Sequence, residues 1–157
     1  MNFRVSGLPL APFAPLFGLS TAELAQHGAV RHTADACPGF PCRVSLQDAE
    51  AGETLLLLNY EHLAVATPYR SRYAIYVRER AEEARLAINE VPQVLRRRLL
   101  SVRALDEAGM LRDADVVEGS ALEPVIERLL NRPEIAYLHV HNAKPGCYAA
   151  RIDRADA

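Results

Sequence analysis

Lysine is nearly missing from this chain: Lys144 is one lysine among eighteen basic residues, and the others are arginines. Arginine makes planar two-point contacts with carboxylate and phosphate groups, so its abundance fits anion recognition as well as GC-rich coding. We attribute most of the arginines to a GC-rich coding sequence rather than to anion recognition. Excess charge of one sign is also missing, because the net charge is −2. The chain therefore lacks the positive field expected of a protein that binds nucleic acid or an anionic membrane surface.

Cysteine and long apolar runs are scarce as well. Three cysteines, an odd number, do not form a disulfide framework, and a reducing cytoplasm is the predicted location. The longest apolar run, around Leu55–Leu58, is too short to cross a bilayer. The apolar stretch at the N-terminus is not typical of a secretion signal, because it is interrupted by Pro9, Pro12 and Pro15.

Half of the 157 residues are apolar, which is enough for one domain with a core of its own. Alternating, β-branched or aromatic segments predict strands over 3–7, 29–33, 43–46, 54–60, 73–78, 100–105 and 110–117, and a last hairpin within 137–153. Helices are few and short. We therefore predict an α+β fold, a single domain over 1–157, with a mainly antiparallel sheet of several hairpins and about three short helices.

Three short helices are predicted from their start signals. Ser20–Glu23 and Ser120–Glu123 both have the spacing of a capping box, in which the serine and the glutamate satisfy each other's free amides. The first helix should end at His27, before Gly28. The remaining helix lies between these two in the chain, from about residue 90 to residue 98, with a proline in its first turn.

The last hairpin carries the most chemistry. Strand side chains alternate between faces, so Tyr137, His139 and His141 point away from the apolar side chains between them. A three-residue loop over 144–146 would pair His139 with Arg151 and keep the apolar sides together, whereas a two-residue loop would mix them. This register predicts one polar face, which comprises Tyr137, His139, His141, Cys147, Arg151 and Asp153.

Three kinds of chemistry fit that face. Cys147 could be a nucleophile activated by His139 or His141, because a thiolate forms readily beside an imidazole. His139 and His141 could instead bind zinc, with Cys147 or the distant His62 as a further ligand, but the required number of ligands is not evident. The pair Cys37 and Cys42 is spaced for zinc but has no second pair, so a loop with incidental cysteines is the simpler interpretation.

The third possibility is an anion pocket without a covalent step. Arginine and tyrosine side chains suit carboxylate or phosphate recognition. The candidates that lie in or beside predicted loops are Arg43, Tyr69 and Arg70, with Arg151 added from the hairpin. The run of arginines at 96–98 is explained more simply by a favourable interaction with a helix end.

Several runs together resemble one bacterial family, the domain-of-unknown-function family 1203. They are Gly39–Leu46, Leu56–His62, Pro68–Arg70, Tyr137–Asn142 and Cys147-Tyr148, and the resemblance covers essentially the whole chain. It implies no activity, cofactor or site. In the family pattern, arginine can stand where this chain has His141, which argues against a site made of two histidines and a metal.

The leading hypothesis is a small cytoplasmic protein that binds a small anionic metabolite at the last hairpin, and whether it also transforms that metabolite is left open. His139 would be the acid/base or hydrogen-bonding group and Cys147 the nucleophile, with Arg43, Tyr69, Arg70, His141 and Arg151 as ligand contacts. No cofactor is predicted, and zinc is the less favoured alternative. A non-catalytic interaction module, or a homo-oligomer, is the competing hypothesis, and an extended apolar patch would favour it.

Overall fold

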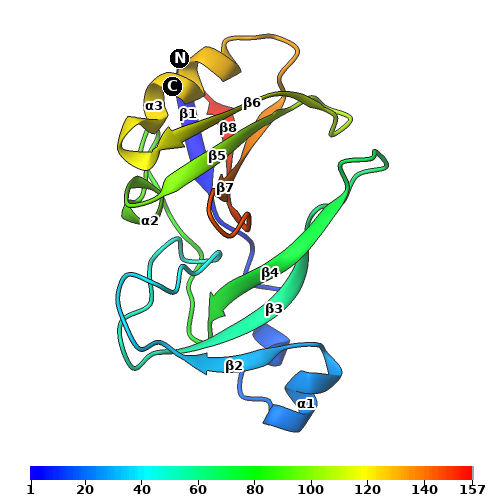
Figure 1. The fold of residues 1–157 in the computed structure, drawn as a ribbon, viewed down its shortest axis with the longest axis vertical. Helices are drawn as coiled ribbons and strands as arrows, with labels where there is room; N and C mark the ends of the chain where they lie inside the picture. Colours follow the sequence, from blue (N-terminus) through cyan, green and yellow to red (C-terminus); the bar gives the residue numbers. More distant parts are fainter. Residues whose placement is uncertain (157) are drawn as a thin grey trace.

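The computed structural model describes residues 1–156, and it contains two antiparallel sheets with short helices (Figure 1). The strands are β1 (Asn2–Ser6), β2 (Val30–Thr33), β3 (Thr54–Leu63), β4 (Ser71–Arg78), β5 (Leu99–Leu105), β6 (Leu111–Glu118), β7 (Tyr137–Asn142) and β8 (Tyr148–Ala155). The α-helices are α1 (Thr21–Gln26), α2 (Gln93–Arg96) and α3 (Leu122–Leu130), and the 3₁₀ turns are η1 (Ala14–Leu16) and η2 (Gly119–Ala121). This confirms the mixed, mainly antiparallel α+β class, although the strands form two sheets rather than one. None of the described helices has the length and apolar character needed to traverse a bilayer.

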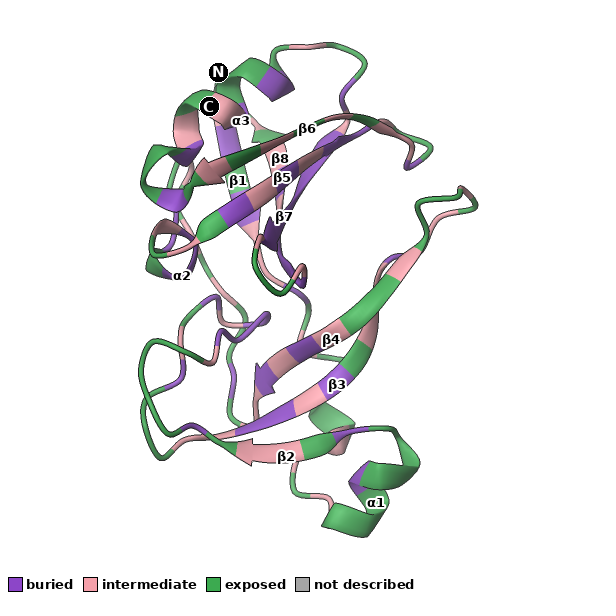
Figure 2. Cartoon of the chain, viewed as in Figure 1, coloured by how far each residue is buried: buried purple, intermediate pink, exposed green. Residues whose placement is uncertain are grey.

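The larger sheet has the strand order β1-β8-β7-β5-β6. Its apolar face packs against α2 and α3, and the side chains of Leu100, Ile126 and Val140 are fully buried there. Strand β7 lies in the middle and is buried along its whole length (Figure 2). The central position of β7 puts both of its histidines inside the protein rather than on its surface.

The smaller sheet has the order β2-β3-β4, and its core is made with the N-terminal segment around Phe13 and Leu24. Tyr148 belongs to β8 of the larger sheet but is buried in this second core. One aromatic side chain of the last hairpin therefore joins the two sheets.

Local signals in the sequence predicted most of these elements but not their ends. The capping box at Ser20 is present, with Ser20 Oγ accepting from the Glu23 amide and Glu23 accepting from the Ser20 amide. The second predicted box is wrong: α3 begins after Ala121 without a side-chain cap, because 119–121 forms a 3₁₀ turn instead. The predicted strand at 43–46 is also wrong, since this segment is a turn in which Leu46 has a φ of 52°.

The last hairpin departs from the predicted register at its tip. Leu138 pairs with Ile152 and His139 with Arg151, as predicted. The loop, however, has four residues, because the Asn142 amide donates to the Cys147 carbonyl and Asn142 accepts from Gly146. A bulge then absorbs the extra residue, so that His141 pairs with Tyr148 and not with Ala149.

The bulge changes which side chains share the polar face of the hairpin. A shift of one residue moves each side chain to the opposite face of a strand. Tyr148 therefore lies with His139 and His141, and Cys147 lies beside Asn142 on the other side. The predicted grouping of Cys147 with His139 is wrong for this reason.

Gly119 provides a test of how the larger sheet holds α2. A Cβ atom at this position would lie 1.9 Å from the Leu95 carbonyl oxygen, and the Gly119 amide donates to the Arg98 carbonyl. We expect Gly119→Ala to lower the free energy of unfolding by about 3 kcal/mol, because backbone must move to relieve the clash. Urea denaturation measures this change. Gly39→Ala is the matched control, since its nearest atom would be at 3.8 Å, and equal losses in both variants would contradict the packing argument.

Candidate functional site

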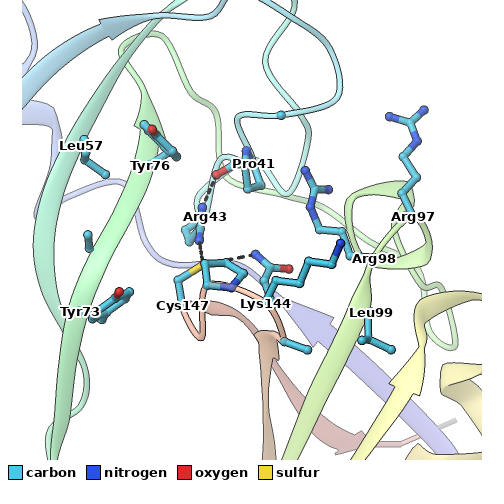
Figure 3. A pocket seen from close by; sticks show the side chains of 15 residues that line it. Pro41, Arg43, Leu57, Tyr73, Tyr76, Arg97, Arg98, Leu99, Lys144 and Cys147 are labelled. Carbon is cyan, nitrogen blue, oxygen red and sulfur yellow. Dashed lines mark hydrogen bonds between the residues drawn. The ribbon is translucent and has the colours of Figure 1, made fainter.

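A cavity of about 510 Å³ lies between the two sheets, beside the tip of the last hairpin (Figure 3). This volume is in the range that holds small metabolites. The side chains that line it come from both sheets, the 39–43 loop, the end of α2 and the β7–β8 loop. They are Gly39, Pro41, Arg43, Leu57, Tyr73, Ala74, Tyr76, Arg97, Arg98, Leu99, Asn142, Ala143, Lys144, Pro145 and Cys147.

Arg43 is the most unusual of these residues, because its side chain is almost fully buried and has no carboxylate partner among residues 1–156. Its guanidinium donates to the carbonyl oxygens of Tyr148 at 2.7 Å and Pro41 at 2.6 Å. A third N–H donates to Cys147 Sγ at 2.9 Å. Burial lowers the pKa of Arg43, and the charge of the neighbouring cysteine opposes that shift. The other two of its five N–H groups have no hydrogen-bond partner within residues 1–156.

Cys147 accepts hydrogen bonds from two sides. Besides Arg43, the Asn142 side-chain amide donates to its Sγ at 3.5 Å. The Cys147 sulfur therefore lies between two hydrogen-bond donors, one of which is a buried cation.

Asn142 carries the second unusual feature of the cavity. It is 95% buried, and its Oδ1 has no hydrogen-bond partner within residues 1–156. A buried acceptor without a donor costs free energy, and such atoms in native proteins call for an explanation. Asn142 is among the residues that line the cavity, so this unsatisfied acceptor belongs to the wall of the site.

The rim of the cavity is basic on one side, where Arg97, Arg98 and Lys144 lie close together (Figure 3). Arg98 is neutralised by Asp48, whose oxygens it contacts at 2.6 and 3.1 Å. Arg97 reaches the same carboxylate only at 3.5 Å, and Lys144 has no ion pair in the described chain. No acidic side chain is among the described residues that line the cavity, so its potential is positive.

The remaining walls are apolar or aromatic. Tyr73, Tyr76 and Leu57 form one wall from the smaller sheet, on the side opposite the basic rim (Figure 3). Leu99 and Pro145 add apolar surface from the larger sheet. An apolar space with a few charged groups at one end is the usual composition of a small-molecule site.

The histidines form a separate cluster on the other face of the hairpin. The rings of His62 and His141 are 5.1 Å apart, and the ring of His139 is 6.3 Å from that of His62. Tyr148 stacks on His62 at 5.3 Å and meets His139 edge-on at 5.0 Å. The cluster connects His62 of β3 with the last hairpin, and none of its members is among the described residues that line the cavity.

Burial keeps these imidazoles neutral. It lowers the pKa of His139 to about 3 and that of His141 to about 4, and nearby positive groups add to both shifts. Burial and Arg103 lower the pKa of His62 as well. His141 Nδ1 lies 3.0 Å from the Gly146 carbonyl oxygen, which fits a protonated Nδ1 that donates. No set of three or more histidine, cysteine or acidic residues within 1–156 is placed to hold a metal ion.

The other predicted contacts lie away from the cavity. Tyr69 and Arg70 are in the β3–β4 loop, where Arg70 pairs with Glu61 at 2.8 Å. Arg151 pairs with Asp153 and lies over the Tyr137 ring at 3.9 Å. Of the seven predicted residues, Arg43 and Cys147 are the two that line the cavity within the described chain, whereas His139 and His141 meet in the histidine cluster.

Four residues of the site were not predicted from the sequence: Asn142, Lys144, Arg97 and Arg98. Lys144 stood out as the single lysine, beside the loop proline and close to Cys147, and that combination was a usable signal. No local signal connects Arg43 with Cys147, because 104 positions separate them.

Comparison with known proteins identifies the family to which the chain belongs. A family model described as "Protein of unknown function (DUF1203)" matches residues 39–154, which include every residue that lines the cavity. The chain belongs to the DUF1203 family. No curated protein and no solved structure matches it significantly. Membership in DUF1203 confirms the resemblance seen in the sequence and brings no activity with it.

Proposed function

We propose that this DUF1203 protein binds a small organic anion in the cavity between its sheets, with the Cys147 sulfur as a nucleophile beside the bound anion. The observation that carries the proposal is the contact between Arg43 and Cys147: a buried guanidinium without a carboxylate meets a sulfur that lines a cavity. The basic rim supports the same conclusion, because it attracts anions.

His139 has no place in this chemistry, since it lies in the histidine cluster. A homo-oligomer or a protein partner stays a prediction, and two of the exposed large apolar side chains, Tyr73 and Leu99, line the cavity itself. The described cysteines are unpaired, and we propose the reducing cytoplasm, where such thiols persist, as the compartment.

Alkylation with a charged and a neutral reagent tests the proposal. Iodoacetate is a small carboxylate and iodoacetamide is its neutral analogue, and each forms an S–CH₂ bond with a thiolate as iodide leaves. We expect the ratio of the iodoacetate rate to the iodoacetamide rate to be about tenfold higher at Cys147 than at the exposed Cys37, because the cavity concentrates anions. Mass spectrometry of the two peptides measures both rates in one sample.

A pair of variants shows which positive charges raise the alkylation ratio at Cys147. Lys144→Gln should reduce the ratio at Cys147, and added salt should do the same. Arg112→Gln is the control, because it removes the same charge from a residue that pairs with Asp106 away from the cavity. An equal ratio at Cys147 and Cys37 in the wild type would refute the anion site.

A further inference from the structure

The cavity makes three demands on its ligand at once. Arg43 and the basic rim require a negative charge, and the walls that carry Tyr73 and Leu99 require an apolar body. The nucleophilic sulfur of Cys147 lines the same space. An inorganic anion meets only the first of these demands.

The unsatisfied oxygen of Asn142 adds a fourth demand. Asn142 Nδ2 and Arg43 Nη2 both contact the Cys147 sulfur, at 3.5 and 2.9 Å, so amide and guanidinium are neighbours around it. Asn142 Oδ1 is buried and has no donor within residues 1–156. A hydroxyl group formed on the carbon next to a carboxylate would lie beside this oxygen when the carboxylate binds Arg43.

We propose that the ligand is a 2-oxo carboxylate with an aromatic or branched apolar side chain, and that Cys147 adds reversibly to its C2 carbonyl. This rests on the anion site proposed above. The sulfur forms a bond to C2 as the π pair of the carbonyl moves to oxygen, and that oxygen takes a proton from water, which leaves as hydroxide. The new hydroxyl donates to Asn142 Oδ1, and the carboxylate stays with Arg43.

The nucleophilic sulfur accounts for the choice of a 2-oxo acid over a 2-hydroxy acid. A 2-hydroxy acid would supply a donor to Asn142 but offers the sulfur no electrophilic carbon. Only the 2-oxo acid uses the anion contacts, the nucleophile and the unpaired acceptor together. A ligand that lacks a positive charge also suits a cavity without acidic lining residues.

Four carboxylates of graded structure test the inference on the wild-type protein. Benzoylformate, mandelate and phenylacetate have the same ring and carboxylate but carry C=O, CHOH or CH₂ at C2, and pyruvate lacks the ring. We expect isothermal titration to show benzoylformate binding about tenfold or more tightly than phenylacetate, and pyruvate more weakly than benzoylformate. Benzoylformate labelled with ¹³C at C2 should show its signal move from the carbonyl region to that of a saturated carbon.

Two variants locate the effect. Cys147→Ser should remove the saturated-carbon signal and reduce benzoylformate affinity to that of phenylacetate for the same variant. Asn142→Leu should weaken benzoylformate selectively, because it removes the acceptor. Circular dichroism at the titration temperature confirms that each variant is folded, and the wild-type series stands without them.

The outcomes separate the two proposals. Equal binding of benzoylformate and phenylacetate, or a C2 signal that stays in the carbonyl region, would overturn the 2-oxo inference and leave the anion site intact. Mandelate as the tightest ligand would overturn it too, because a preformed hydroxyl would then suffice. Failure of all four carboxylates to bind, together with equal alkylation ratios at Cys147 and Cys37, would refute the anion site itself.

Discussion

Replacing Arg43 with methionine is expected to lower the free energy of unfolding by about 3–5 kcal/mol. Methionine fills a similar volume but leaves the buried carbonyl oxygens of Pro41 and Tyr148, and the Cys147 sulfur, without a donor. Each buried acceptor left unsatisfied costs about 1–3 kcal/mol. Native proteins are stable by only about 5–15 kcal/mol, so the loss should be plain in urea denaturation.

The same variant should change the chemistry of Cys147. At pH 7 and low temperature, where the variant remains folded, we expect iodoacetamide to alkylate Cys147 about tenfold more slowly than in the wild type, because the cation that stabilises the thiolate is gone. The rate at Cys37 should not change. Arg43→Lys should restore the alkylation rate of Cys147 only in part, since one ammonium group cannot span three separate acceptors.

Arg112→Met is the matched control for stability. Arg112 pairs with Asp106 at 2.6 Å on the surface, with half of its own side chain exposed. Such a pair contributes about 0–1 kcal/mol, so the control should lose little. An Arg43→Met variant that is as stable as this control, and whose Cys147 reacts at the wild-type rate, would contradict the role assigned to Arg43.

Acid should destabilise the protein well before its carboxylates are protonated. His139 and His141 have pKa values of about 3 and 4 in the fold, below the ordinary value near 6.5. The unfolded chain therefore binds more protons than the native state between these values, and stability falls as the pH falls below about 6.5. At pH 7.5 the contribution of both histidines is fully present.

The expected size of this effect is large. A histidine whose native pKa lies below 5 contributes about 2 kcal/mol between pH 6.5 and pH 5, because one pKa unit corresponds to about 1.4 kcal/mol. The two histidines together should lower the free energy of unfolding by about 4 kcal/mol between pH 7.5 and pH 5. Urea denaturation at a series of pH values measures the slope.

His139→Phe should remove about half of that slope, because phenylalanine does not titrate and keeps an aromatic ring against Tyr148 and His62. His27→Phe makes the same replacement at an exposed position at the C-terminal end of α1 and is the control for introducing a phenylalanine. A wild-type slope that is flat between pH 7.5 and pH 5 would contradict the burial of neutral imidazoles.

Part of the site was open to prediction because it depends on neighbours in the chain. Alternation along β7 placed His139 and His141 on one face, and the apolar match of Leu138 with Ile152 selected the correct register for most of the hairpin. Gly146 has a φ of 80°, a left-handed conformation that glycine adopts readily in a tight loop. These features follow from backbone geometry and local burial.

The bulge could not be predicted in the same way. Both Cys147 and Tyr148 can end a strand on either face, and the sequence offers no local reason to choose. The choice depends on the second core, which takes the Tyr148 ring, and on Arg43, which takes the Cys147 sulfur. Both partners come from the first half of the chain.

The sequence by itself determined the mixed antiparallel class, most of the strands, the absence of a strongly basic surface, and Arg43 and Cys147 as candidates. Only the tertiary structure decided that these two residues meet, that the histidines form a separate buried cluster, and that Asn142 and Lys144 complete the cavity. The physical reason is range: strand alternation and caps act over a few residues, whereas a buried charge is satisfied by whichever group the packing of two sheets brings to it.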